Sequence, residues 1–173
     1  LGGCLYTPVN GHVTVPDGVV ELETEAFKGC STLVSITLPD SLTTLGNYTF
    51  AQCGYLVNIT LPDGLTSLGK GALGWCTSLV SITIPDGVTS LPGSMFYGCT
   101  SLVNITLPDG LASIDDRDFY GCTSLASITL PDGIASIGGS VFSGCTSLAL
   151  VYVPAGCTVA AGAFFNTGAA CSS

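Results

Sequence analysis

The chain has 173 residues, of which 47% are hydrophobic and only 9% are charged, and its formal net charge is −9 at pH 7. A disordered acidic segment would be rich in charge and poor in apolar residues, so this composition predicts a folded domain. Nucleic-acid binding needs several basic residues on one face, and the chain has only Lys28, Lys70 and Arg117, so this function is excluded. No apolar run reaches the roughly 18 residues that a membrane span requires, so we expect no membrane span.

A repeat of 23 residues organises the chain. Proline recurs with this period at positions 16, 39, 62, 85, 108, 131 and 154, and cysteine recurs at 30, 53, 76, 99, 122 and 145. Such a repeat predicts a solenoid in which each coil stacks on the next, with atypical coils at both ends. The division is a cap with a partial repeat at 1–15, six full repeats over 16–153, and a partial repeat with a cap at 154–173.

Within one repeat, the predicted elements follow the order turn, extended piece, corner and strand. The turn is Pro-Asp-Gly, in which glycine is expected to adopt the left-handed conformation. A short extended piece follows, as at 65–68, and then a glycine-rich corner that includes one short helical turn. The corner carries an apolar column that we expect inside the solenoid. Its members are Phe27, Phe50, Leu73, Phe96, Phe119 and Phe142.

The last element of each repeat is a strand with one buried face. In the segment 33–38, Ile36 and Leu38 alternate with Ser35 and Thr37. Apolar residues with a period of two point to one side of a strand. The polar residues are then expected to form a flat, uncharged lattice that faces solvent. Its threonine column consists of Thr37, Thr60, Thr83, Thr106 and Thr129.

Two motifs carry a resemblance to a known family. The segment Leu33-Val34-Ser35-Ile36-Thr37-Leu38 is the Leu-x-x-Leu-x-Leu strand of leucine-rich repeats, and the run 142–148 is similar to the BspA-like subclass. The asparagine ladder that commonly follows the strand is missing, and Pro-Asp-Gly stands near its place. The resemblance implies a right-handed solenoid of parallel strands, used for adhesion or protein binding. It also implies a location at the cell surface or outside the cell, with an organelle lumen as the alternative.

The predicted coils leave little room for a helix opposite the strands. Neighbouring strands lie about 4.8 Å apart, whereas packed helices need about 8–10 Å, and this difference is what bends leucine-rich repeats into a horseshoe. We therefore expect nearly equal coil spacing on both sides and a nearly straight stack.

The repeating cysteines are expected to form a ladder of buried thiols that act as small hydrophobic groups. Pairing neighbours in this column as disulfides would force unequal coils from nearly equal sequences. No metal site is predicted among them, because zinc needs a Cys-x-x-Cys motif or several histidines, and the chain has a single histidine. A disulfide between Cys157 and Cys171 is the candidate in the C-terminal cap, which leaves Cys4 unpaired.

A column of aspartates follows the prolines along one edge of the predicted solenoid. Turn chemistry explains this column, because Asp side chains form local hydrogen bonds in turns. Bridging of successive carboxylates by Ca²⁺ is the second interpretation, although no other oxygen-rich column lies beside it. The members are Asp17, Asp40, Asp63, Asp86, Asp109 and Asp132.

Positions that break the repeat form the predicted contact surface. Tyr97 and Tyr120 share a column in adjacent repeats. Trp75 lies one repeat earlier and in the neighbouring column, where it replaces a glycine. Tyr48 and Tyr55 are expected to extend this stripe. Clustered aromatic residues are typical of protein interfaces, and local packing over the glycine-rich corners is the alternative interpretation.

Two further segments depart from the repeat. Leu150 and Tyr152 occupy outward-facing strand positions that are polar elsewhere, so either the tail 160–173 folds over them, which we favour, or a partner docks there. The charged segment 115–118 lies near the aromatic stripe, where it either tunes specificity or forms a solvated corner.

These observations predict a protein that is not an enzyme and needs no cofactor, because no nucleophile has a base beside it. The expected function is protein–protein interaction, either in adhesion and surface recognition or as an accessory structural subunit of a larger assembly. Binding of ice or carbohydrate through the Ser/Asn-x-Thr strand face is the alternative.

Overall fold

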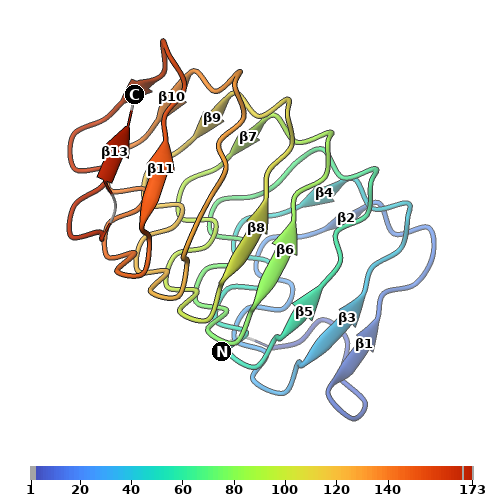
Figure 1. The fold of residues 1–173 in the computed structure, drawn as a ribbon. Coiled ribbons are helices and arrows are strands. Elements are labelled where there is room, and N and C mark those ends of the chain that lie inside the picture. Colours follow the sequence, from blue (N-terminus) through green and yellow to red (C-terminus); the bar gives the residue numbers. More distant parts are fainter. Residues whose placement is uncertain (1–2, 169, 173) are drawn as a thin grey trace.

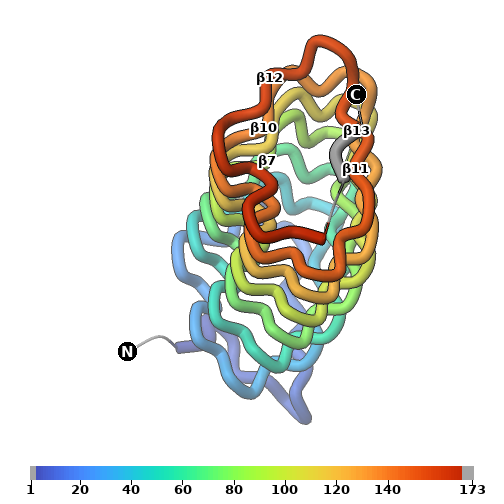
Figure 2. Tube along the Cα trace, turned by 60° about the vertical axis from the view of Figure 1, so that its left-hand side comes forward, coloured from blue at the N-terminus to red at the C-terminus, as the bar shows by residue number. Residues whose placement is uncertain are grey.

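The structure, a computed structural model, is a solenoid of short parallel strands (Figure 1). It describes residues 3–168 together with the backbone of 170–172. Most coils contribute short strands to two sides, and the coils follow one another as a regular stack (Figure 2). The strands of the first side are β1 (His12–Thr14), β3 (Ser35–Thr37), β5 (Asn58–Ile59), β6 (Ser81–Thr83), β8 (Asn104–Thr106), β11 (Leu150–Tyr152) and β13 (Ala170–Ser172). Those of the second side are β2 (Glu21–Leu22), β4 (Thr44–Leu45), β7 (Ser90–Leu91), β9 (Ser113–Ile114), β10 (Ser136–Ile137) and β12 (Thr158–Val159).

Parallel pairing places equivalent residues of neighbouring repeats side by side. Ser35 lies beside Asn58 in β3 and β5, and Leu91 lies beside Ile114 in β7 and β9. These partners are 23 residues apart, which agrees with the period in the sequence. The segment after 153 continues the solenoid as a further coil, in which β12 pairs with β10 and β13 pairs with β11.

The predicted helical turn is wrong, because no helix occurs in the described part of the chain. The corner is instead a series of tight turns, in which Cys30 N–H donates to Phe27 O. Other corner N–H groups donate to the next coil, as Phe27 N–H does to Thr49 O. Because these groups already bond between coils, they are not free to form the i to i−4 bonds of an α-helix.

The left-handed positions also differ from the prediction. Among the Pro-Asp-Gly turns, only that of Gly18 has glycine at positive φ, and Gly156 has it in the Pro-Ala-Gly turn of the last coil. Two columns in the corner adopt this conformation in every full repeat instead. One column comprises Glu25, Tyr48, Gly71, Ser94, Arg117 and Ser140. The other, which we call the corner-glycine column, comprises Gly29, Gln52, Trp75, Gly98, Gly121 and Gly144.

Stacked phenyl rings run through the core beneath these corners. Phe96, Phe119 and Phe142 follow one another at centroid distances of 5.4 and 5.5 Å, with nearly parallel rings. Phe164 of the last coil continues the stack at 5.2 Å from Phe142. Leu73 interrupts the column, as its sequence position indicates. The prediction that this column lies inside is confirmed.

The cysteine ladder is buried as predicted from Cys53 to Cys145. Each thiol donates to a carbonyl 26 residues earlier, as Cys53 Sγ does to Phe27 O at 3.0 Å and Cys99 Sγ does to Leu73 O at 3.1 Å. Burial raises the pKa of Cys53 to about 11 and that of Cys99 and Cys145 to about 12. These thiols therefore stay protonated and unreactive at neutral pH.

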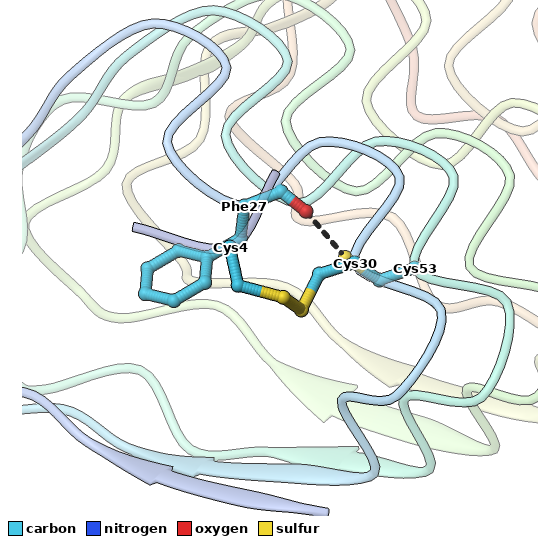
Figure 3. The surroundings of a disulfide bond; sticks show 4 residues. All are labelled: Cys4, Phe27, Cys30 and Cys53. Atoms are coloured by element: carbon cyan, nitrogen blue, oxygen red, sulfur yellow. Dashed lines mark hydrogen bonds between the residues drawn. A yellow bond between two sulfur atoms is a disulfide. The ribbon is translucent and has the colours of Figure 1, made fainter. Parts of the chain in front are cut away.

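One cysteine prediction is corrected. Cys30 and Cys4 are not free thiols, because they form a disulfide with each other (Figure 3). The disulfide between Cys157 and Cys171 stays a prediction, because the side chain of Cys171 lies outside the described residues. Cys157 precedes β12 and Cys171 lies in β13, and these strands belong to different sheets.

The threonine face is exposed but is not a flat, continuous lattice. All five threonines of the column face solvent. However, β5 and β6 belong to separate sheets, and residues 127–129 form no strand. A hollow of about 360 Å³ lies where β5 and β6 are separated. Its lining includes Asn58, Thr60, Ser81, Thr83 and Asn104. This shape gives no support to ice or carbohydrate binding through a regular flat surface.

The C-terminal tail extends the sheet without covering the outward face of β11. Tyr152 and Leu150 remain 57% and 54% exposed, although β13 pairs with the backbone of β11. The expectation that the tail folds over these side chains is therefore wrong. The tail uses its backbone to pair with the strand edge, and such pairing leaves the outward side chains in solvent.

A candidate recognition surface

Trp75, Tyr97 and Tyr120 form a row on the corner surface, which we call the aromatic ladder. The rings of Tyr97 and Tyr120 stack at 4.8 Å with an interplanar angle of 8°. The ring of Trp75 packs on Tyr97 at 5.2 Å with a tilt of 49°. Trp75 is 49% exposed and Tyr120 is 36% exposed. The structure therefore brings together the three aromatic residues that the sequence singled out.

The backbone aims the Trp75 side chain along the ladder. Trp75 lies in the corner-glycine column with φ of 61°, a conformation that L-residues adopt at a cost of about 1–2 kcal/mol. Gly98 follows it in the same column, and a Cβ built there would lie 2.7 Å from Trp75 Cε3. The indole therefore rests on the bare backbone of Gly98, which a larger residue would block.

A slot opens beside Trp75, and Tyr48 and Tyr97 are among the residues that line it. Tyr48 lies across the slot and packs over Gly71, where an added Cβ would lie 2.6 Å from the ring. The floor includes Ala51 and Gly74, which occupy the column that holds Tyr97 and Tyr120 in later coils. The slot has a volume of about 340 Å³. It exists because two successive coils lack the ring that continues the ladder.

Lys28 borders the slot but brings little net charge to it. Its Nζ lies 5.6 Å from the centroid of the Tyr48 ring, over the ring face. The same ammonium forms a salt bridge with Glu25. The walls are therefore mainly aromatic and uncharged, with the Gln52 side chain as a further polar group at the edge.

The charged segment 115–118 is only partly a solvated corner. Asp118 is fully buried and accepts hydrogen bonds from Met95 N–H at 2.8 Å and Asp115 N–H at 2.9 Å. Burial raises the pKa of this carboxyl well above its ordinary value of 3.8. Asp116 accepts from Gly139 N–H at 2.6 Å. These carboxylates hold neighbouring coils together, while the side chain of Arg117 faces solvent.

The in-register coils carry a repeat whose sequence pattern is shared with known proteins. Residues 6–95 and 74–171 match the family described as the BspA type leucine rich repeat region, with six copies. The chain belongs to the BspA-type leucine-rich repeat family. Members of this family are built as repeat scaffolds, and the resemblance suggested by the sequence is confirmed.

Solved structures of bacterial leucine-rich repeat proteins share this fold. A leucine rich cell surface protein from Faecalibacterium prausnitzii is 36% identical with a TM-score of 0.79, over 86% of this chain and 40% of its own. The leucine rich repeat protein of T. pallidum is 34% identical with a TM-score of 0.86, over 90% and 76%. A protein from Bacteroides ovatus is 32% identical with a TM-score of 0.69, over 90% and 46%. The chain thus spans less than half of two of these proteins. A search of curated proteins found no match.

Other predicted contact residues of this BspA-type repeat protein lie apart from the slot. Tyr55 is 64% exposed but does not line it, and Leu150 and Tyr152 lie on the strand side at the last coils. The aspartate column is exposed, and no group of three metal-ligating side chains converges within the described residues. Within the same part of the chain, no helix is long and apolar enough to cross a bilayer.

The slot itself was missed by sequence reasoning. Tyr48 was proposed as an extension of the stripe, and it does line the slot beside Trp75. The signal that could have located the gap is the pair Ala51 and Gly74, two small residues in the column of Tyr97. The direction in which Trp75 leans could not be read, because it depends on the left-handed φ of that residue.

Proposed function

We propose that this chain is a non-enzymatic recognition module that binds another protein through the aromatic ladder and the adjoining slot. The observation that carries the proposal is Trp75, a large and half-exposed side chain in a column where four of six repeats have glycine. Aromatic residues of this kind contribute most of the binding energy in protein interfaces.

Local packing is the competing explanation for the ladder, and the repeats themselves argue against it. The coil that contains Ser143 and Gly144 has neither ring at these positions, yet its Phe142 stacks on Phe119 at 5.5 Å, as Phe119 does on Phe96 at 5.4 Å. The fold therefore does not need these rings. An exposed aromatic patch that the fold does not need is typical of a contact site.

The proposed location is the cell surface or the extracellular space. The Cys4–Cys30 disulfide supports it, because disulfides persist in oxidising compartments. One similar structure is itself described as a cell surface protein. In that setting the chain acts in adhesion or as an accessory subunit, and the ladder is its contact face.

Site-specific photo-crosslinking tests this function. Tyr120 is replaced by a photo-reactive phenylalanine analogue in one variant and Tyr152 in another, and each is exposed to surface proteins of the native source. We expect a crosslinked partner from position 120 that disappears when Trp75→Gly is added. Crosslinks from position 152 alone would assign the interface to the outward face of β11 and overturn the proposal.

A further inference from the structure

The strand side of the first coils brings a base next to a nucleophile. Strands β1, β3 and β5 form one parallel sheet (Figure 1), and its register places His12 beside Ser35 and Ser35 beside Asn58. The distance between His12 Nδ1 and Ser35 Oγ is 2.8 Å. The sequence showed no nucleophile with a base beside it, because these two residues are 23 positions apart and meet only through the stacking of the coils.

Two threonine hydroxyls hold the other end of the His12 imidazole. Its Nε2 lies 3.2 Å from Thr37 Oγ1 and 3.3 Å from Thr14 Oγ1. With its proton on Nε2, the neutral ring donates to these oxygens, and the lone pair of Nδ1 accepts from the hydroxyl of Ser35. A nucleophile, a base and a group that orients the base are the parts that activate a hydroxyl for acyl transfer.

Asn58 lies on the other side of Ser35 and offers a donor for the oxygen of an attacked carbonyl group. Its side chain is exposed and makes no hydrogen bond within the described residues. Neighbouring strands lie about 4.8 Å apart, so the Asn58 amide is within reach of a carbonyl oxygen on a group that is joined to Ser35 Oγ. An amide N–H in this place stabilises the negative charge that develops on that oxygen in the transition state.

The surroundings of these residues admit a neutral acyl donor. Asn58 also borders the hollow of about 360 Å³ on this face, whose lining contains hydroxyl, amide and aliphatic groups and no charged side chain. The net charge of the chain is −9, so anionic donors are repelled. A neutral ester is therefore the class of donor that this face favours.

We propose that Ser35 is a site of covalent acylation, with His12 as its general base and a neutral ester as the acyl donor. Ser35 Oγ attacks the ester carbonyl carbon while His12 Nδ1 takes the hydroxyl proton. The tetrahedral intermediate then expels the alkoxide, which receives this proton from His12 and leaves as an alcohol. The products are an acyl ester on Ser35 and the free alcohol. This modification of the chain itself lies on the strand side, and it does not depend on the proposed recognition function.

Reaction of the full chain with 4-nitrophenyl acetate tests this site. Mass spectrometry of the digested chain locates the acetyl groups on hydroxyl and imidazole side chains. We expect acetylation at Ser35 and little at Ser81 and Ser127, which occupy the same column but have no histidine beside them. Equal acetylation of the three serines, or acetyl groups on His12 in place of Ser35, would overturn the inference.

Two variants separate activation of Ser35 from its accessibility. His12→Gln keeps a hydrogen-bonding side chain but removes the base, and we expect the rate of acetylation at Ser35 to fall about a hundredfold. Ser127→Ala changes the same column outside the sheet of β1, β3 and β5, and its Ser35 is expected to react at the wild-type rate. Equal rates at Ser35 in His12→Gln and Ser127→Ala would refute the role of His12.

An uncharged alkyl fluorophosphonate provides an independent measurement. An activated hydroxyl displaces fluoride from this reagent, so that an O–P bond forms, the P–F bond breaks and hydrogen fluoride leaves. We expect one phosphonyl group per chain, located on Ser35, and no labelling of Ser35→Ala or His12→Gln. Labelling that persists in Ser35→Ala would place the reactive group elsewhere and contradict the assignment.

Discussion

The corner-glycine column shows how one residue is retained at a cost to the fold. Gln52 and Trp75 adopt positive φ where the other repeats have glycine. Side chains with a Cβ pay about 1–2 kcal/mol for this conformation. The exposed Gln52 side chain makes no hydrogen bond within the described residues, whereas Trp75 packs on Tyr97. A comparison of substitutions at Gln52 and Trp75 therefore distinguishes the cost of the strained backbone from the contribution of the Trp75 ring.

Gln52→Gly is expected to stabilise the protein by about 0.5–1 kcal/mol. It removes the strain, and the greater freedom of glycine in the unfolded chain offsets part of the gain. Trp75→Gly removes the same strain but also loses ring packing, so its net effect on stability is expected to be within about 1 kcal/mol. Urea denaturation measures both. A loss of several kcal/mol for Trp75→Gly would show that the ring serves the fold.

The buried thiols predict how stability depends on pH. Their pKa values in the folded chain are about 11 for Cys53 and about 12 for Cys99 and Cys145, against 9.0 for an exposed thiol. Above pH 9 the unfolded chain releases these protons and the folded chain does not, so unfolding becomes more favourable as pH rises toward 11 or 12. Below pH 9 the thiols contribute no pH dependence.

Thermal unfolding between pH 8 and pH 11 tests this prediction. The midpoint is expected to fall above pH 9, and the fall is expected to be smaller in Cys99→Ala than in the wild type. An equal slope in the two proteins would contradict it. In Cys171→Ser, a thiol reagent at pH 8 is expected to label Cys157 before any member of the ladder, because Cys157 is only partly buried.

At the scale of the element, the phenyl stack transmits stability from coil to coil. Phe119 lies between Phe96 and Phe142 and is fully buried, whereas Phe164 ends the stack with one ring neighbour and is only partly buried. Phe119→Ala is expected to cost about 3–5 kcal/mol, and Phe164→Ala clearly less. Guanidinium denaturation of both variants gives the comparison, and equal losses would contradict nearest-neighbour stacking.

The sequence predicted those elements that depend only on the period. In-register stacking places residues that are 23 positions apart side by side. From this period the sequence predicted the strand columns, the phenyl stack, the thiol ladder and the adjacency of Tyr97 and Tyr120. The corner was misjudged, because glycine-rich turns and a helical turn have similar composition. Hydrogen bonds between coils decide the outcome there, as Phe27 N–H to Thr49 O shows.

The breaks in the structure were harder to predict than its regularity. Residues 127–129 follow the strand pattern but pair with no neighbour as a strand, and β5 and β6 belong to separate sheets. The Cys4–Cys30 disulfide was missed because Cys4 lies 26 residues before Cys30, outside the 23-residue register. That spacing is the one that separates each thiol of the ladder from its carbonyl acceptor.

At the scale of the whole molecule, the disulfide closes one end of the solenoid. Its sequence separation of 26 residues corresponds to about 3.5 kcal/mol of loop-closure entropy. In Cys4→Ser, hydrogen exchange is expected to accelerate at Leu5 N–H, which bonds Ala26 O, and to stay unchanged at Phe119. Acceleration spread evenly over the chain would show that the coils unfold as one unit rather than from the end.

The central claim about function is that the aromatic ladder binds the partner. The affinity of the chain for the crosslinked partner tests this claim most directly. The partner is purified, and its dissociation constants for wild type, Trp75→Gly and Ser140→Gly are measured side by side. We expect a loss of about tenfold or more for Trp75→Gly and wild-type affinity for Ser140→Gly, which replaces another residue of positive φ outside the ladder and the slot. Equal affinities for the wild type and Trp75→Gly would contradict it.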